Sequence, residues 1–111
     1  MDSNELLKGT LKTIILKLLS ENGKMYGYEI TQTIKELTKD EIQIKEGSLY
    51  PALHSLLAEG LLTTESEIVD GRARKYYKLT KEGKSVTKKK IEEFTDFVFV
   101  MQGLLKIKFA R

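Results

Sequence analysis

The chain has 111 residues, of which 41% are hydrophobic and 32% charged, a composition typical of one globular domain rather than of a disordered segment. It contains no cysteine and a single histidine, which excludes a disulfide framework, a thiolate metal site and a histidine-rich metal site. No apolar run is long enough to span a membrane and the N-terminus lacks a basic signal-peptide region. We therefore expect a cytoplasmic protein with no cofactor.

The positive charge is concentrated in one part of the chain. The net charge is only +3, but between residues 72 and 90 every charged side chain except Glu82 is lysine or arginine. A basic stripe of this kind suits a polyanion such as a nucleic acid. A run of like charges is more often only a solvated surface, so charge alone leaves the partner open.

The N-terminal segment has the pattern of one long amphipathic helix. Residues 2–5 have the order of a capping box, and leucine and isoleucine then recur with the helical period as far as Leu19. Asn22-Gly23 is a typical stop signal. The pattern predicts a single helix from the capping box to this stop.

Two shorter elements are expected next. A second helix opens with the sequence YGYEI at residues 26–30 and ends near residues 38–40. Ile42 and Ile44 alternate with polar residues over a short distance, which predicts a stub of β-strand.

The following helix, over residues 46–60, has one apolar face made by leucines at helical spacing. Its other face holds only short side chains and a proline, where long lysine and glutamate side chains are usual. Short residues let a helix backbone approach the base edges of DNA, although they also let one helix pack closely on another. The residues of this bare face are Ser48, Pro51, His54, Ser55 and Ala58.

A β-hairpin and a last helix complete the chain. Residues 61–69 and 75–79 are the expected strands, and Asp70-Gly71 is a strong turn signal, so the hairpin tip should carry Arg72 and Arg74. Thr80 is expected to cap the last helix, which should run to about Lys108. Its apolar residues recur at a spacing of three and four, as in a short coiled-coil seam.

This order of elements predicts a mainly α fold with a small β-hairpin, namely a winged helix-turn-helix over residues 1–80, followed by a C-terminal dimerisation helix over residues 81–111. In such a fold the 46–60 helix enters the major groove and the 70–75 wing contacts the minor groove or phosphates. The hydroxyls of Tyr26 and Tyr50 could each donate to a phosphate. Alternatively, each tyrosine is a core aromatic with only its hydroxyl in water. The residues expected to contact DNA are Tyr26, Ser48, Tyr50, Pro51, His54, Ser55, Gly71, Arg72, Arg74 and Lys75.

The last helix has more apolar surface than one small core can cover, because residues 97–101 are apolar on every side. A second copy of the chain is the simplest cover, and a two-fold dimer would present two reading helices to a pseudo-palindrome. The residues expected at the interface are Leu7, Leu11, Ile91, Phe94, Phe97, Val98, Met101, Leu104 and Leu105.

Three segments resemble the PadR family of bacterial transcriptional regulators: YGYEI at 26–30, GSLYPALHSLLAEGLL at 47–62 and GRARKYYKLT at 71–80. The resemblance implies a homodimer that binds operator DNA and usually represses. It also assigns Ser48–Leu53 to the recognition helix and Arg74–Thr80 to the second strand of the wing. With one helix after the wing, the chain is similar to the small PadR-like subgroup.

Some members of that subgroup bind flat hydrophobic compounds at the dimer interface through a tryptophan, which this chain lacks. The sequence therefore does not decide whether a small hydrophobic effector binds at the dimer interface. Phe94, Phe97, Phe99 and Met101 are interpreted as dimer core. A winged helix that binds protein instead of DNA is the main alternative. An enzyme is not expected, because no G-x-S-x-G elbow or phosphate-binding glycine loop accompanies His54 or the serines near it.

Overall fold

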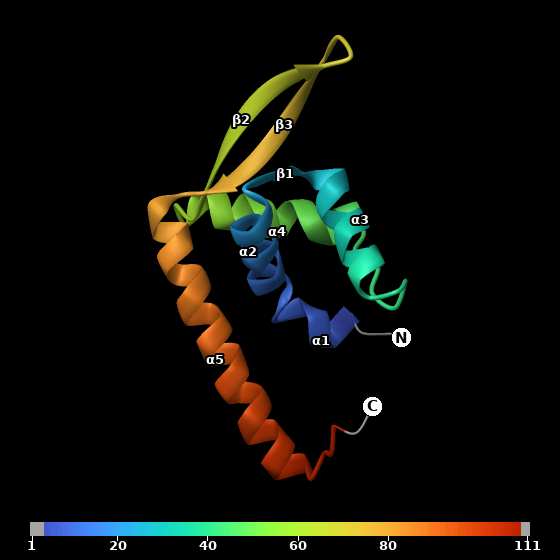
Figure 1. Cartoon of the computed structure of the whole chain (residues 1–111), viewed down its shortest axis with the longest axis vertical. Coiled ribbons are helices and arrows are strands. Elements are labelled where there is room, and N and C mark those ends of the chain that lie inside the picture. Colours follow the sequence, from blue (N-terminus) through green and yellow to red (C-terminus); the bar gives the residue numbers. More distant parts are fainter. Residues whose placement is uncertain (1–3, 110–111) are drawn as a thin grey trace.

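The computed structural model describes residues 4–109 of the chain. The molecule is elongated, at 53 × 30 × 21 Å, because a β-hairpin projects from one end of a helical body and a long helix from the other (Figure 1). The elements in chain order are α1 (Asn4–Lys8), α2 (Leu11–Asn22), β1 (Lys24–Tyr26), α3 (Gly27–Leu37), α4 (Glu46–Ala58), β2 (Leu62–Val69), β3 (Arg72–Leu79) and α5 (Lys81–Leu105).

The predicted single N-terminal helix is wrong, because the chain breaks it into α1 and α2. Gly9 and Thr10 stand at the break, and both the backbone N–H and the hydroxyl of Thr10 donate to the carbonyl of Leu7, which closes α1. Part of the predicted capping box lies outside the described residues. The stop signal is confirmed, since α2 ends at Asn22 and Gly23 has a φ of 82°.

The short strand of the sheet is also not where the sequence placed it. Ile42 and Ile44 form no strand; they pack against the core from a loop in which the hydroxyl of Thr38 accepts the Ile42 N–H at 3.0 Å. The strand is instead β1, directly before α3, and it pairs with β3. Helix α3 therefore begins one residue later than predicted, at Gly27, with Tyr26 as its N-cap.

The sheet has the order β1-β3-β2 and is antiparallel throughout. The hairpin of β2 and β3 confirms the predicted wing, and its register runs from Leu62 opposite Leu79 to Val69 opposite Arg72. The base of the sheet closes the core, with Met25, Leu62 and Tyr77 buried, while the outer half of the hairpin extends into solvent.

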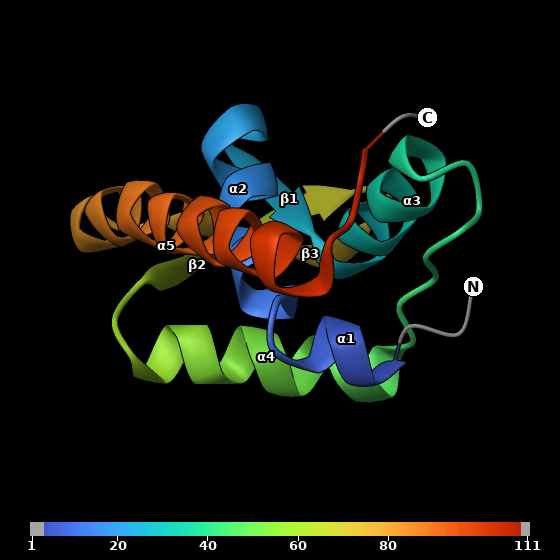
Figure 2. The ribbon, with the colours of Figure 1, turned by 90° about the horizontal axis from the view of Figure 1, so that it is seen from below.

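The core lies where α2 packs between α4 and α5 (Figure 2). The leucine face of α4 provides its floor, because Leu49, Leu53 and Leu56 are almost completely buried. The cap of α5 is as predicted, with the Thr80 hydroxyl accepting the Gly83 N–H at 3.0 Å. The helix ends at Leu105 rather than near Lys108, because Lys106 takes a left-handed conformation.

Candidate nucleic-acid interface

The wing ends in a tighter turn than the sequence predicted. Only Asp70 and Gly71 form the turn, and both have positive φ values, 52° and 77°, as a two-residue hairpin loop of this hand requires. Arg72 and Arg74 lie in strand β3 rather than at the tip, which corrects the predicted placement. Their spacing of two puts both side chains on one face of the strand, whereas Lys75 is on the other face.

Strand β3 has a free edge close to the helices. β1 pairs with it only from Lys78 to Tyr76, so residues 72–75 have no strand on that side. The chain turns there from β1 into the first turn of α3, and α4 passes beneath. The free edge, the start of α3 and one side of α4 together enclose an open groove of about 860 Å³.

The groove brings together most of the residues that the sequence singled out for DNA. From α4 come Tyr50 and His54, from β3 the two arginines and Lys75, and from the start of α3 its N-cap tyrosine. Tyr28 and Tyr77 also line the groove and were not predicted. The YGYEI segment could have indicated that Tyr28 lies at the groove, since Tyr26 and Tyr28 flank the same helix start. The predicted residues on the groove are Tyr26, Tyr50, His54, Arg72, Arg74 and Lys75.

All of the tyrosines of the chain gather at this groove. Tyr26, Tyr28, Tyr50 and Tyr77 line it, and Tyr76 contacts the ring of Tyr26 edge-on at a centroid distance of 5.5 Å. Such rings combine an apolar surface with a hydroxyl that can donate to an anion.

Gly27 fixes the distance between α3 and α4 at the floor of the groove. A Cβ atom at this position would lie 2.5 Å from the hydroxyl of Tyr50, so any side chain here would have to displace that tyrosine. Tyr50 is half-buried, and its proximity adds to burial in raising the pKa of Tyr77. The Tyr77 hydroxyl therefore stays protonated at neutral pH.

Arg74 is held in place by the aromatic rings beside the groove. Its guanidinium lies 4.2 Å from the centroid of the Tyr26 ring, a cation–π contact. A hydrogen bond with Tyr76 is the main cause that raises the pKa of Arg74 above its ordinary value. The side chain is therefore a permanent positive charge held over an aromatic ring.

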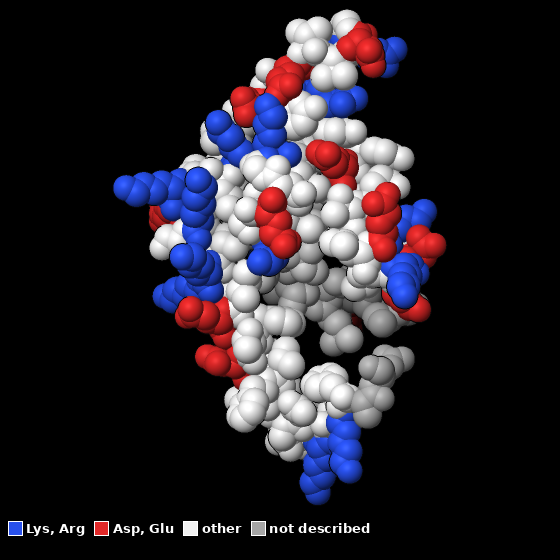
Figure 3. All heavy atoms as spheres, viewed as in Figure 1, with Lys and Arg blue, Asp and Glu red and all other residues white. Residues whose placement is uncertain are grey.

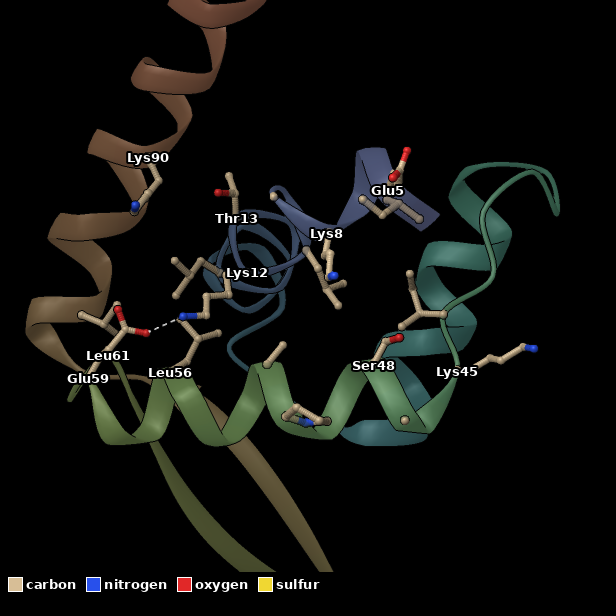
Figure 4. A pocket seen from close by; sticks show the side chains of 18 of the residues that line it. Glu5, Lys8, Lys12, Thr13, Lys45, Ser48, Leu56, Glu59, Leu61 and Lys90 are labelled. Carbon is tan, nitrogen blue, oxygen red and sulfur yellow. Dashed lines mark hydrogen bonds and ion pairs between the residues drawn. The ribbon is translucent and has the colours of Figure 1, made fainter. Parts of the chain in front are cut away.

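The other side of α4 faces a second depression, of about 750 Å³, between this helix and α1 and α2 (Figure 4). Ser48 and Pro51 line it, so the structure places these predicted residues away from the wing groove. Ser55 is on the same side, and its hydroxyl donates to Glu59 at 3.3 Å. The charged residues that line this depression are four lysines, Lys8, Lys12, Lys45 and Lys90, and two glutamates, Glu5 and Glu59.

The chain is similar to known proteins of one family. Residues 15–89 match the model of the transcriptional regulator PadR-like family. A transcriptional regulator of Mycobacterium tuberculosis is 37% identical over 81 residues, which cover 73% of this chain and 72% of that protein. The chain belongs to the PadR-like family of transcriptional regulators.

Solved structures of transcriptional regulators also resemble this chain. A transcriptional regulator from Clostridium thermocellum has a TM-score of 0.79 at 34% identity, with 96% of this chain and 99% of that chain covered. Bacillus subtilis PadR, solved in complex with operator DNA, has a TM-score of 0.66 at 34% identity, with 74% of this chain and 46% of that chain covered. The family consists of regulators rather than enzymes, as predicted.

Two negative findings concern residues 4–109 of the PadR-like chain. This part contains no cluster of three acidic, histidine or cysteine side chains that could hold a metal ion. It also contains no helix that is both long enough and apolar enough to cross a membrane.

The residues predicted for a dimer interface fall into three groups. Leu11 is only 7% exposed and belongs to the chain's own core, so it is not an interface residue. Leu7, Ile91, Val98 and Met101 are half-buried. The remaining residues are exposed on the distal half of α5, where Figure 3 shows a largely uncharged surface, and they are Phe94, Phe97, Leu104 and Leu105.

Proposed function

We propose that this PadR-like chain is a cytoplasmic repressor that binds pseudo-palindromic operator DNA as a homodimer. Helix α4 would lie in the major groove, and the wing would contact the minor groove or phosphates. The observation that carries the proposal is the wing groove. Its cations and tyrosines come from three separate elements and line one open space, as an interface with phosphates requires. The operator complex of Bacillus subtilis PadR, which is similar over 74% of this chain, supports it.

The outer face of α4 supports entry into a groove. Pro51, His54 and Ala58 are exposed and are all shorter than the lysine and glutamate usual on a solvent face. A major groove is about 12 Å wide and a helix with side chains measures about 10–12 Å, so long outer residues would hold the backbone away from the bases. Short residues remove that obstacle.

The distal half of α5 supports the homodimer. Phe97 is 57% exposed and Leu104 is 68% exposed, on a helix that the rest of the chain does not cover there. An apolar surface of this kind on a PadR-like chain is best covered by the same surface of a second copy. We assign Phe94, Phe97 and Met101 to this dimer core rather than to an effector pocket.

Binding to duplex DNA over a range of salt concentrations tests the interface. The wild type should bind at low salt, and the logarithm of its affinity should fall linearly with the logarithm of salt concentration. Arg72→Gln and Arg74→Gln should each flatten that slope by about one, as expected for a lost phosphate contact. Lys17→Gln removes an equal charge from the exposed side of α2 and should leave the slope unchanged. If the wild type ignores duplex DNA at low salt, the protein-binding winged helix replaces this proposal.

Two further measurements test the assembly and the direction of regulation. Light scattering should give the mass of two chains at micromolar concentration, and a mass of one chain would refute the dimer. An operator selected from a pool of random duplexes should contain two half-sites about one helical turn apart. A reporter placed behind that operator should be expressed less when the protein is present, and higher expression would make the protein an activator.

A further inference from the structure

Arg74 has an acidic neighbour that it does not pair with. In the register of the hairpin it is directly opposite Glu67, whose side chain is on the same face of the sheet. Glu67 forms its ion pair with Lys24 of strand β1 instead. Within the described residues Arg74 forms no ion pair, and its guanidinium lies over the ring of Tyr26.

Strand β1 supplies both of the residues that produce this arrangement. Lys24 and Tyr26 are two positions apart, so both side chains are on the outer face of the sheet, next to Lys78 and Tyr76. Tyr26 contacts Tyr76 at an angle of 82°, and the Lys24 ammonium lies 5.1 Å from the centroid of the Tyr76 ring. The rings therefore fix the side chains of β1 against the centre strand.

The acids of β2 are matched by lysines and not by arginines. Lys24 lies 3.6 Å from Glu65 as well as contacting Glu67, and Lys78 lies 3.7 Å from Glu65. Lysine thus forms the ion pairs within the sheet, where a point charge is sufficient. Arginine has five donors in a fork that fits phosphate, and Arg74 has no carboxylate partner among the described residues.

We propose that Lys24 and Tyr26 are positioning residues for Arg74. Tyr26 holds the guanidinium on its ring, and Lys24 occupies Glu67, so that the charge of Arg74 stays unpaired for a DNA phosphate. Neither residue needs to touch DNA for this role. The inference rests on the proposed function, and it assigns to Tyr26 a role for its ring rather than for its hydroxyl.

Removing Lys24 should redirect Glu67 to the arginine that faces it. A phosphate would then compete with a carboxylate for the same guanidinium. Because pairs between exposed charges are weak, the loss of DNA affinity from Lys24→Gln should be modest, about two- to fivefold at low salt. The cation–π contact is of similar strength, so Tyr26→Leu should also cost about three- to fivefold.

A double-mutant cycle distinguishes this role from a direct contact of Lys24 with DNA. Affinity for a fluorescent duplex of mixed sequence is measured for the wild type, Lys24→Gln, Glu67→Gln and the double variant. Positioning predicts that Lys24→Gln weakens binding only while Glu67 is present. An equal loss in the Glu67→Gln background would show that Lys24 contacts DNA itself, and this would overturn its positioning role.

A second cycle tests the tyrosine ring. Tyr26→Phe keeps the ring and should retain most of the affinity that Tyr26→Leu loses. In an Arg74→Ala background the Tyr26→Leu change should cost nothing further, since its effect acts through Arg74. If Tyr26→Phe is as weak as Tyr26→Leu, the hydroxyl contacts DNA and the positioning role of the ring is refuted.

Nuclear magnetic resonance of the free protein gives a reading that does not depend on DNA. The ring of Tyr26 should shift the side-chain protons of Arg74, and the shift should vanish in Tyr26→Leu and persist in Tyr26→Phe. A wild type that fails to bind DNA would refute the proposed function and this inference together. A wild type that binds DNA, with losses that are additive in both cycles, would refute this inference alone.

Discussion

The winged-helix body and the distal half of α5 are both rich in apolar side chains but bury them differently. In the body, Ile15 and Leu53 have no exposed surface. On α5, Phe97 is 57% exposed and Phe99 is 76% exposed. The body satisfies the hydrophobic effect within one chain, whereas the distal half of α5 has an apolar surface that only another molecule can cover.

The boundary between the buried and the exposed apolar side chains lies within helix α5. The first turns of α5 belong to the body, because Gly83 and Thr87 are buried and a Cβ atom on Gly83 would lie 2.1 Å from the carbonyl oxygen of Leu61. Beyond Lys90 nearly all side chains are exposed or half-buried. Substitutions on the two sides of this boundary should therefore affect different properties.

The largest effect is expected in the body. Leu53→Ala removes a side chain of α4 with no exposed surface and leaves a cavity, so it should lower the free energy of unfolding by about 2–5 kcal/mol. Urea denaturation at fixed protein concentration measures the loss. Ala58→Ser changes an exposed residue of the same helix and should have little effect. A tolerated Leu53→Ala would mean that the body is not the self-sufficient unit described above.

On the other side of the boundary, Phe97→Asp should leave the fold intact and dissociate the proposed dimer. A central aromatic at an interface typically contributes about 2–4 kcal/mol to association, and the new charge would be buried against the partner. Sedimentation equilibrium measures the dissociation constant. Thr95→Asp adds the same charge to an exposed position on nearly the opposite face of α5 and should dissociate the dimer much less. Equal weakening by both variants would contradict a specific seam.

The elements that depend on a strong helical period or on local turn and cap residues were predictable from the sequence. The leucine face of α4, the Asp70-Gly71 turn and the Thr80 cap each depend on local chemistry, and the structure confirms them. The break between α1 and α2 was missed because the apolar period continues across Gly9 and Thr10, whose hydrogen bonds end the first helix. Strand β1 was missed because three residues carry no period of their own and pair with a strand far along the chain.

The site was partly predictable for the same reason. Residue type and motif identified the arginines, Tyr50 and His54, and the fold brings them to one groove. No local pattern shows that Arg74 stacks on Tyr26 or that Glu67 pairs with Lys24, since both contacts depend on the register of three strands. Leu11 was assigned to the wrong surface because an apolar stripe does not reveal which partner covers it.

A smaller effect on stability is expected at Thr80, where the body joins the start of α5. The Thr80 hydroxyl accepts the Gly83 N–H at 3.0 Å and donates to the Gly60 carbonyl at 2.7 Å, so it joins the end of the body to the start of α5. Thr80→Val keeps the shape and removes both hydrogen bonds, which should cost about 1–2 kcal/mol of stability. Thermal denaturation measures it, with Thr63→Val on the exposed face of β2 as the control. An unchanged melting temperature would show that the cap contributes nothing.

The smallest effect concerns Glu59, which follows α4 and accepts a hydrogen bond from Lys12 at 2.9 Å. This hydrogen bond is the main cause that lowers the pKa of Glu59 below its ordinary value of 4.5. A lowered pKa in the folded state means that the carboxylate stabilises the fold above about pH 4.5 and that this contribution is lost as the pH falls below it. Because both side chains are about half exposed, the contribution should be under about 1 kcal/mol.

Glu59→Gln should therefore be slightly less stable than the wild type at neutral pH, and the difference should shrink as the pH falls below 4.5. Urea denaturation at several pH values measures the difference. In a Lys12→Gln background the same substitution should have a smaller effect at neutral pH, because the main partner of the carboxylate is gone. A stability difference that stays constant with pH would mean that Glu59 acts through packing. The ion pair between Lys12 of α2 and Glu59 at the end of α4 would then not stabilise the fold.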